Sequence, residues 1–281
     1  EEEREEPEGQ MDFFGALGIT GGLEKEKGKE KKPMTKKAEP IVALTHMQEK
    51  DNAKADVLNE DQEQAAGSLK RRTAVIAGPG TGKTRTLISR LQFLLYDRRV
   101  PPEHITAVTF TNQAAGEIRE RLQKACQNPE WLKSVQIGTF HAICLRFLKK
   151  IGKKPVLADE ENFKDLAKAV MVQFQIDGKT EDFLKQAEAW KTRHILRETE
   201  SESRHPDREA AYRAYEEEKQ SRGWYEFEDL LLETVRLFKE HPKETDWRSP
   251  FDYLLIDEFQ DISPVQYRLM IEWSPYGSSR C

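Results

Sequence analysis

The sequence predicts an α/β fold in which a parallel β-sheet carries helices on its faces, is interrupted by a helical insertion and is preceded by a disordered, charged N-terminal segment. Three observations predict it. A glycine-rich stretch around residue 80 lies between an apolar run and a helical run. Strand-like and helix-like segments alternate up to residue 150, and helical segments fill residues 151–245 before another apolar run. Strands that alternate with helices form parallel sheets, because each helix returns the chain to the same sheet edge.

The charge pattern sets residues 1–57 apart from the rest. The first residues are almost all acidic, and residues 24–37 mix glutamate with many lysines. A segment of this composition buries too little apolar surface to fold, so we expect a disordered, charged linker. The short apolar stretch between Met11 and Ile19 is interpreted as part of that linker, with a partner-docking motif as the alternative. Order is expected to begin near Leu58.

The composition argues against several classes of protein. The formal net charge of −5 gives no global basic signal, so contact with nucleic acid must come from a local patch. Cys126, Cys144 and Cys281 have no paired spacing, which argues against a disulfide framework or a zinc site and for a reducing compartment. No apolar run approaches the ~18 residues of a membrane span, and no signal peptide is recognisable. Because the chain starts at Glu1 rather than Met, we expect it to be an excerpt of a longer one.

The glycine-rich stretch AGPGTGKT, residues 77–84, predicts a phosphate-binding loop. A predicted strand at Thr73–Ile76 leads into it, and a predicted helix over residues 86–96 leads out. Glycines let successive backbone N–H groups converge on one concavity, and the helix start adds the positive end of its dipole. In such a loop Lys83 would reach the β- and γ-phosphates and Thr84 would hold Mg²⁺. An ordinary glycine-rich turn is the alternative interpretation.

Two acids after a later strand supply the second half of such a site. The apolar run Phe251–Ile256 ends at Asp257 and Glu258. Asp257 would hold Mg²⁺, and Glu258 would orient and deprotonate an attacking water. Without the phosphate loop, this pair would most often be an exposed strand end. Together the two elements indicate nucleotide hydrolysis.

Two further strands, Ile105–Phe110 and Val135–Phe140, are predicted between the loop and the insertion. The carboxyl ends of parallel strands meet at one sheet edge, where ligands bind. That edge would gather Lys83, Thr109–Asn112 and Thr139–His141. An aromatic ring beside hydroxyl and amide groups suggests binding of a single nucleic-acid strand, because bases stack on such rings.

Local signals predict the remaining elements. A short helix, Leu58–Ala66, should start at the N-cap Asn59, have Gln62 in its capping box and end at Gly67. Within residues 151–243, no clear strand is expected after Val156–Leu157. The helices of the insertion are predicted at residues 160–175, 181–197, 208–221 and 226–239.

These blocks together resemble the N-terminal part of the UvrD/Rep/PcrA-type superfamily 1 DNA helicases. The resemblance covers about residues 58–272, with the blocks in the family's order. Residues 58–66 look like the adenine-reading Q motif, residues 77–85 like motif I and residues 257–261 like motif II. The resemblance implies a RecA-like P-loop NTPase sheet, with ATP and Mg²⁺ as cofactors.

The resemblance also implies roles for single residues. Gln62 stands at the base-reading position, Arg85 at a nucleotide-contacting position and Gln260 at the γ-phosphate sensor. The implied ATP-binding set is Gln62, Gly78, Pro79, Gly80, Thr81, Gly82, Lys83, Thr84 and Arg85. The implied metal ligands are Thr84 and Asp257, and the implied catalytic residues are Glu258, Lys83 and Gln260.

Two blocks resemble the family's track for single-stranded DNA, motif Ia at residues 109–115 and the following block at residues 138–142. The family usually has lysine where this chain has Gln113, a difference expected to weaken one charge contact. Without the resemblance, His141 would be interpreted as a core or capping histidine. The segment Tyr225–Leu231 resembles the family's Asp-Phe-Asp-Asp-Leu-Leu segment. The implied DNA contacts are Thr109, Phe110, Thr111, Asn112, Thr139, Phe140 and His141.

The resemblance implies five parts. They are a linker at 1–57, the first part of RecA-like domain 1A at 58–150, helical subdomain 1B at 151–245, the return to domain 1A at 246–274 and an irregular tail at 275–281. The family's later motifs, which include arginine fingers on a second RecA-like domain, are missing. We therefore expect the N-terminal fragment of an ATP-dependent 3′→5′ DNA helicase, nearly inactive without that partner half. The implied setting is a bacterial-type cytoplasm, with single-stranded DNA and no membrane as partner.

Two other functions stay open from the sequence. One is a non-catalytic module that binds nucleotide or DNA. The other is the N-terminal part of an AddA/RecB-like helicase–nuclease. A phosphate-loop kinase fits less well, because the Asp-Glu-Phe-Gln-Asp block at residues 257–261 suits activation of water better than transfer to a bound acceptor.

Overall fold

The computed structural model describes residues 58–125, 128–196 and 206–274. The expectations for the linker at 1–57, with its apolar stretch, and for the tail at 275–281 lie outside the described residues. So do Cys126 and Cys281. Within the described ranges, none of the helices is both long enough and apolar enough to cross a membrane.

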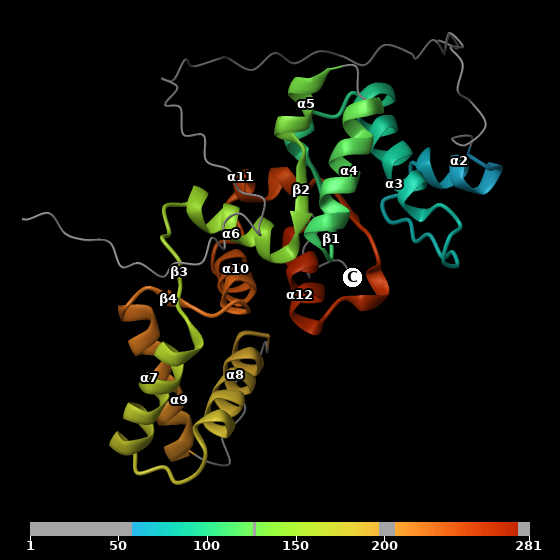
Figure 1. Cartoon of the computed structure of the whole chain (residues 1–281). Coiled ribbons are helices and arrows are strands. Elements are labelled where there is room, and N and C mark those ends of the chain that lie inside the picture. The colour runs from blue at the N-terminus through green and yellow to red at the C-terminus, as the bar shows by residue number, and fades with distance from the viewer. Residues whose placement is uncertain (1–57, 126–127, 197–205, 275–281) are drawn as a thin grey trace, which may run out of the picture.

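A three-stranded parallel sheet forms the centre of the fold, as predicted. Strand β1 (Ile105–Thr109) lies between β2 (Gln136–Thr139) and β5 (Tyr253–Ile256). In the register, Thr109 is opposite Thr139 and Val108 is opposite Ile256. The carboxyl ends of the three strands therefore lie side by side (Figure 1).

Helices cover both faces of this sheet, so the body has three layers (Figure 1). Side chains alternate between the faces of a strand. Ile105 and Ala107 accordingly pack into one core with helices α3 and α4, whereas Val108 packs into the other with α6, α10 and α12. These helices are α3 (Lys83–Gln92), α4 (Asn112–Ala125), α6 (Phe140–Lys150), α10 (Asp229–Glu240) and α12 (Pro264–Trp273).

The strand predicted at Thr73–Ile76 does not form. The segment has no regular structure, and Val75 and Ile76 are 49% and 98% exposed. In the described part of the sheet, β2 and β5 are edge strands that each pair with β1 alone, and residues 73–76 pair with neither. A strand is held by the backbone and side chains of its neighbours, so an apolar run without one stays irregular.

The short first helix follows its capping signal closely. Helix α2 (Glu60–Ala66) starts at Asn59, whose side chain accepts a hydrogen bond from the backbone N–H of Gln62, while Gln62 returns the bond to Asn59. Gly67 ends the helix. The capping box predicted from the sequence is confirmed.

The insertion has a core of its own, built from helices α7 (Glu160–Gln173), α8 (Thr180–Leu196) and α9 (Pro206–Ser221). Helix α10, which lies within the expected range 151–245, instead packs its apolar side with α6 and α12 in the body. Figure 1 shows the three insertion helices projecting from the sheet body.

A second, very short sheet closes the neck of the insertion. Strand β3 (Val156–Leu157) pairs in parallel with β4 (Trp224–Tyr225). The expectation that no clear strand follows Leu157 within residues 151–243 is therefore wrong. Only two residues pair, so local sequence carries almost no signal for β4. The pairing depends on the return of the chain from α9.

Short elements connect the rest. They are the π-turn η1 (Phe93–Asp97), the 3₁₀ turns η2 (Pro102–His104), η3 (Ser249–Phe251) and η4 (Phe259–Asp261), and the short helices α5 (Pro129–Ser134) and α11 (Thr245–Arg248).

Cys144, on α6, offers a test of the packing of α6 against α10. Its side chain is fully buried, and burial raises the pKa of the thiol to about 12 because the thiolate would lose its hydration. We expect iodoacetamide at about pH 8 to leave Cys144 unmodified in the folded chain and to alkylate it in urea, since only the thiolate reacts. Mass spectrometry of the peptide that contains Cys144 measures both states. Rapid alkylation without urea would contradict the packing of α6 against α10.

Candidate functional site

The glycine-rich loop is open to solvent and is shaped by two left-handed glycines. Gly80 and Gly82 have φ angles of 75° and 89°. The hydroxyl of Thr81 donates to the carbonyl of Gly78 at 2.7 Å, which closes the turn from within. Of the other predicted loop residues, Pro79 is exposed, and Lys83, Thr84 and Arg85 form the half-buried first turn of α3. The N-terminus of α3 therefore faces the loop.

Gln62 connects α2 to this loop. Its side-chain Nε2 donates to the carbonyl of Thr81 at 2.7 Å, and its Oε1 accepts from the N–H of Asn59 at 2.9 Å. A Cβ atom added to Gly82 would lie only 2.9 Å from the same Nε2. The glutamine, expected to contact adenine, thus uses both ends of its amide within the chain. Contact with a base would require it to release Thr81.

Lys83 and Glu258 come together although they lie far apart in the sequence. The Lys83 Nζ is 3.4 Å from Glu258 Oε2, and both side chains are partly exposed. Lys83 opens α3 after the loop, and Glu258 follows the end of β5. The sheet therefore brings the loop and the acidic pair to one edge, as the sequence predicted.

Glu258 has an unusual backbone and a well-held side chain. Its φ of 49° and ψ of 46° lie in the left-handed region, which costs a non-glycine residue of order 1–3 kcal/mol. Gln260 donates to Oε2 of Glu258 at 2.8 Å. This hydrogen bond, together with Lys83, lowers the pKa of the Glu258 carboxyl. The Glu258 carboxyl is therefore ionised at neutral pH.

Asp257 continues the line of β5, where its backbone N–H donates to the carbonyl of Val108 at 2.9 Å. Desolvation, and then the neighbouring charge of Glu258, raise the pKa of its carboxyl. A partly buried carboxylate beside a second one favours a nearby cation. No cluster of three or more His, Cys, Asp or Glu with metal-site geometry occurs among the described residues. One carboxylate and the Thr84 hydroxyl, completed by phosphate oxygens and water, suit Mg²⁺.

A second strip of predicted residues follows the ends of β1 and β2. Thr111 and Asn112 are exposed, and Phe110 is half-buried. The hydroxyl of Thr111 accepts from the N–H of Ala114, and the hydroxyl of Thr139 accepts from the N–H of Ala142. These threonines cap α4 and α6, so both helix N-termini open at the same sheet edge.

Two of the seven predicted DNA contacts, Thr109 and Phe140, have buried side chains in this structure. Thr109 is 1% exposed, and its hydroxyl donates to the carbonyl of Thr111 at 3.0 Å. Phe140 is 2% exposed and stacks on Trp273, with ring centroids 5.8 Å apart. Neither side chain has a surface to offer a ligand in this structure. Their positions support Thr111 and the start of α6.

The strip continues onto a residue absent from the predicted site. The ring of Phe227 stacks on His141, with centroids 3.8 Å apart, and His141 Nε2 lies 3.5 Å from Glu228 Oε2. Phe227 is 43% exposed and lines an open cavity of about 310 Å³ with Tyr225. The sequence signal for Phe227 is weak: a large apolar side chain stands between two acids in the segment Tyr225–Leu231.

A glycine-rich loop that opens a helix, with its lysine beside an acid at the end of a parallel strand, defines the phosphate-loop class of α/β proteins. Residues 58–274 match the family described as "UvrD/REP helicase N-terminal domain". The chain therefore belongs to the UvrD/REP helicase family and carries its ATP-binding domain.

Curated relatives agree with this assignment. The chain is 32% and 34% identical to proteins named probable DNA helicase II homologs in Mycoplasma capricolum and Mycoplasma pneumoniae, over 76% of its own length. It is 29% identical to the ATP-dependent DNA helicase PcrA of Staphylococcus aureus over 78% of its length. In each case the match spans 32% of the relative, so the chain covers about a third of the length of these proteins.

Two glycines offer a matched test of the loop. Gly82→Ala should lower the free energy of unfolding by about 1–3 kcal/mol, because a left-handed φ and the close Gln62 Nε2 both oppose a side chain. Gly116→Ala, inside α4 with nothing within 4 Å of an added Cβ, should raise it by about 0.4–1 kcal/mol. Urea unfolding of both variants measures the difference. Equal shifts of the same sign would contradict the loop geometry.

The raised pKa of Asp257 predicts that its ionised carboxylate lowers the free energy of unfolding. Because the folded state raises this pKa, deprotonation weakens folding as pH rises through the interval between the unfolded and folded values. Asp257→Asn should therefore raise the free energy of unfolding at pH 7. The gain should shrink as pH falls through that interval, where the wild-type carboxyl is protonated. Urea unfolding between pH 4 and pH 7 measures it. A gain in the free energy of unfolding that does not depend on pH would contradict the raised pKa of Asp257.

Proposed function

We propose that this chain binds ATP with Mg²⁺ at the phosphate loop and single-stranded DNA along the carboxyl ends of β1 and β2. In the whole protein, ATP hydrolysis would drive 3′→5′ movement along that strand. The observation that carries the proposal is the contact of Lys83 with Glu258, which unites the phosphate loop with the acidic pair. Its direction, 3′→5′, rests on family resemblance.

The contact explains how nucleotide binding would prepare the site. A phosphate group offers Lys83 more charge than one half-exposed carboxylate does, so the lysine would leave Glu258 for the β- and γ-phosphates. The released carboxylate, ionised at neutral pH and still held by Gln260, would then accept the proton of the attacking water. Gln260 would be the group that senses the γ-phosphate.

Thr84 and Asp257 would hold Mg²⁺, which supplies charge neutralisation at the phosphates. The raised pKa of Asp257 supports this role, because burial and the charge of Glu258 both oppose ionisation of its carboxyl, and a bound cation would offset them. Gly78 to Gly82, Arg85 and the N-terminus of α3 would surround the phosphates, and Gln62 would contact the adenine once it releases Thr81.

The residues proposed to contact DNA, here called the DNA strip, are Phe110, Thr111, Asn112, Thr139, His141 and Phe227. All but Phe227, which stacks on His141, follow the ends of β1 and β2. The strip would bind a single strand by base stacking and by contacts with its backbone. Phe110 and Phe227 offer rings for bases, each worth about 1–3 kcal/mol. Thr111, Asn112 and Thr139 would contact phosphates where α4 and α6 begin. Strand β1 joins the two sites directly, because its Val108 carbonyl holds the N–H of Asp257 while its end leads to Phe110.

Turnover is proposed to need a second RecA-like half, which would bring arginine fingers to the γ-phosphate. Such fingers contribute about 10³ to 10⁵ in rate in related phosphoryl transfers. The chain alone would then bind ATP·Mg²⁺ and single-stranded DNA with little hydrolysis. The alternative, a non-catalytic binding module, would bind the same ligands. It differs in that no second half would join it to supply the arginine fingers.

The test is ATP binding and hydrolysis by the chain, with and without single-stranded DNA. Lys83→Ala should weaken binding of a fluorescent ATP analogue with Mg²⁺ by roughly tenfold to a hundredfold, as expected for the loss of charge-assisted hydrogen bonds. Lys124→Ala, which removes an exposed surface ion pair with Glu120, is the matched control and should bind like wild type.

Each outcome decides something. Weak binding by Lys83→Ala alone, with no DNA-stimulated turnover in wild type, would support a motor half. DNA-stimulated turnover that Lys83→Ala abolishes would overturn the need for a second half. Equal binding by both variants would overturn the ATP site itself.

A further inference from the structure

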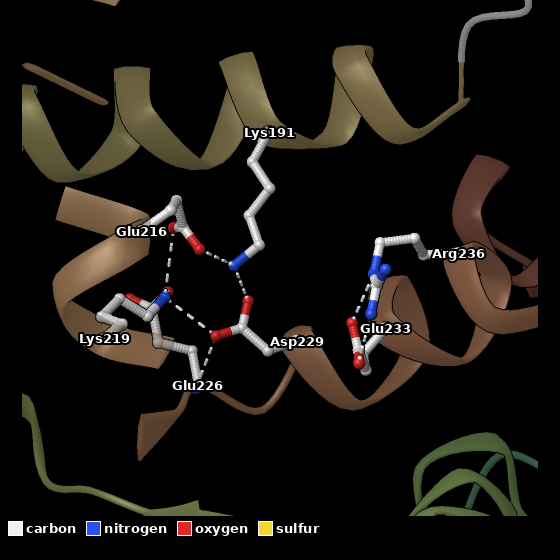
Figure 2. A network of polar contacts seen from close by, with 7 residues as sticks. All are labelled: Lys191, Glu216, Lys219, Glu226, Asp229, Glu233 and Arg236. Carbon is white, nitrogen blue, oxygen red and sulfur yellow. Dashed lines mark hydrogen bonds and ion pairs between the residues drawn. The ribbon is translucent and has the colours of Figure 1, made fainter. Parts of the chain in front are cut away.

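A compact cluster of charged side chains lies where the insertion meets the sheet body (Figure 2). Asp229, at the start of α10, contacts Lys191 of α8 through one carboxylate oxygen and Lys219 of α9 through the other, at 2.8 Å. Glu216 contacts both lysines, and Glu226 contacts Lys219. Figure 2 shows these side chains converging from three elements.

The cluster is buried and its charges are nearly balanced. Lys219 is 1% exposed, and Asp229 is 9% exposed. Burial opposes the charge on Lys219, yet Asp229, Glu216 and Glu226 outweigh it and raise the pKa of the amine. Burial likewise opposes the charge on Asp229, and the two lysines outweigh it, so the pKa of the carboxyl is lowered. Each partner therefore depends on the others, because a buried charge left alone is costly.

The cluster holds both ends of one short turn. Within residues 226–229, Glu226 and Asp229 point to the lysines, and the N–H of Glu226 donates to Asp229 at 2.9 Å. Phe227 and Glu228, between them in the chain, contact His141 at the start of α6. The same four residues thus contact both the insertion and the proposed DNA strip.

We propose that Asp229, with Lys191 and Lys219, is a positioning device for the DNA strip, which holds the turn 226–229 so that Phe227 stays stacked on His141. The inference rests on the proposed function, since it concerns the same strip. None of these three charged residues would touch DNA. They act through Phe227, and they tie its orientation to the packing of α8 and α9.

The proposal links the packing of the insertion helices to the affinity for a single DNA strand. Any partner that shifts α8 or α9 would alter the cluster, and through it the ring of Phe227. Substitutions in the cluster should therefore weaken base stacking while leaving contacts with phosphates and with ATP unchanged. This separates the cluster from a merely structural role, which would weaken all three together.

The experiment compares three variants of the 281-residue chain. Asp229→Asn breaks the cluster with little change in shape. Glu226→Gln, at a position 32% exposed, is a milder break that should fold even where the first does not. Arg236→Gln is the matched control, because it removes an ion pair with Glu233 on the same helix, away from the turn (Figure 2).

Binding is measured by anisotropy of a fluorescent oligo(dT) strand at several salt concentrations. A strand containing 2-aminopurine reports stacking. We expect Asp229→Asn to weaken binding by roughly twofold to thirtyfold, the range for substitutions that act through a neighbour. Glu226→Gln should move in the same direction by less, and Arg236→Gln should match wild type. The salt dependence, which counts phosphate contacts, and the affinity for the ATP analogue should not change.

A double-mutant cycle with Phe227→Ala completes the test. If the cluster acts through Phe227, then adding Asp229→Asn to Phe227→Ala should weaken binding no further. Additive losses, a changed salt dependence or a parallel loss of ATP affinity would overturn the inference. So would wild-type affinity in both cluster variants. Failure of the wild-type chain to bind the strand would instead overturn the proposed DNA site, which keeps the two failures distinct.

Discussion

The pairing of β1 with β5 is the constraint on which the rest of the structure depends. These strands are separated in sequence by the entire insertion, and their parallel register sets Val108 opposite Ile256. That register fixes where Asp257 and Glu258 emerge and sets them beside the loop that carries Lys83. The two ends of the insertion return to one neck, where β3 pairs with β4.

Charge is used in two contrasting ways in this molecule. Around Glu258 the ion pair is partly exposed, so solvent screens it and a stronger anion can replace the carboxylate on Lys83 at small cost. Around Asp229 the pairs are buried, so separating them is expensive and the cluster persists. An exchangeable contact suits a site that must accept a ligand, whereas a persistent one suits the junction between two cores.

Much of the site could be predicted from sequence because its signals are local. The cap at Asn59, the loop before α3 and the acids after β5 each occupy a few consecutive residues. The failures concern partners that local sequence does not reveal. An apolar run such as Thr73–Ile76 becomes a strand only beside a neighbour. Phe140 was assigned by its motif, yet the packing of Trp273 buries it. Lys219 of α9 is buried, because the carboxylates of Glu226 and Asp229, which lie beyond that helix, join Glu216 around its amine.

The left-handed backbone at Glu258 has a consequence for how this domain can evolve. Glycine adopts that conformation without penalty, and asparagine tolerates it better than glutamate does. Selection for heat resistance alone would therefore favour replacing Glu258, and each stabilising replacement would remove the carboxylate that the proposed hydrolysis requires. Retention of glutamate at this position in a lineage would mark selection for turnover, whereas drift to glycine or asparagine would mark a descendant that keeps the fold and has given up hydrolysis.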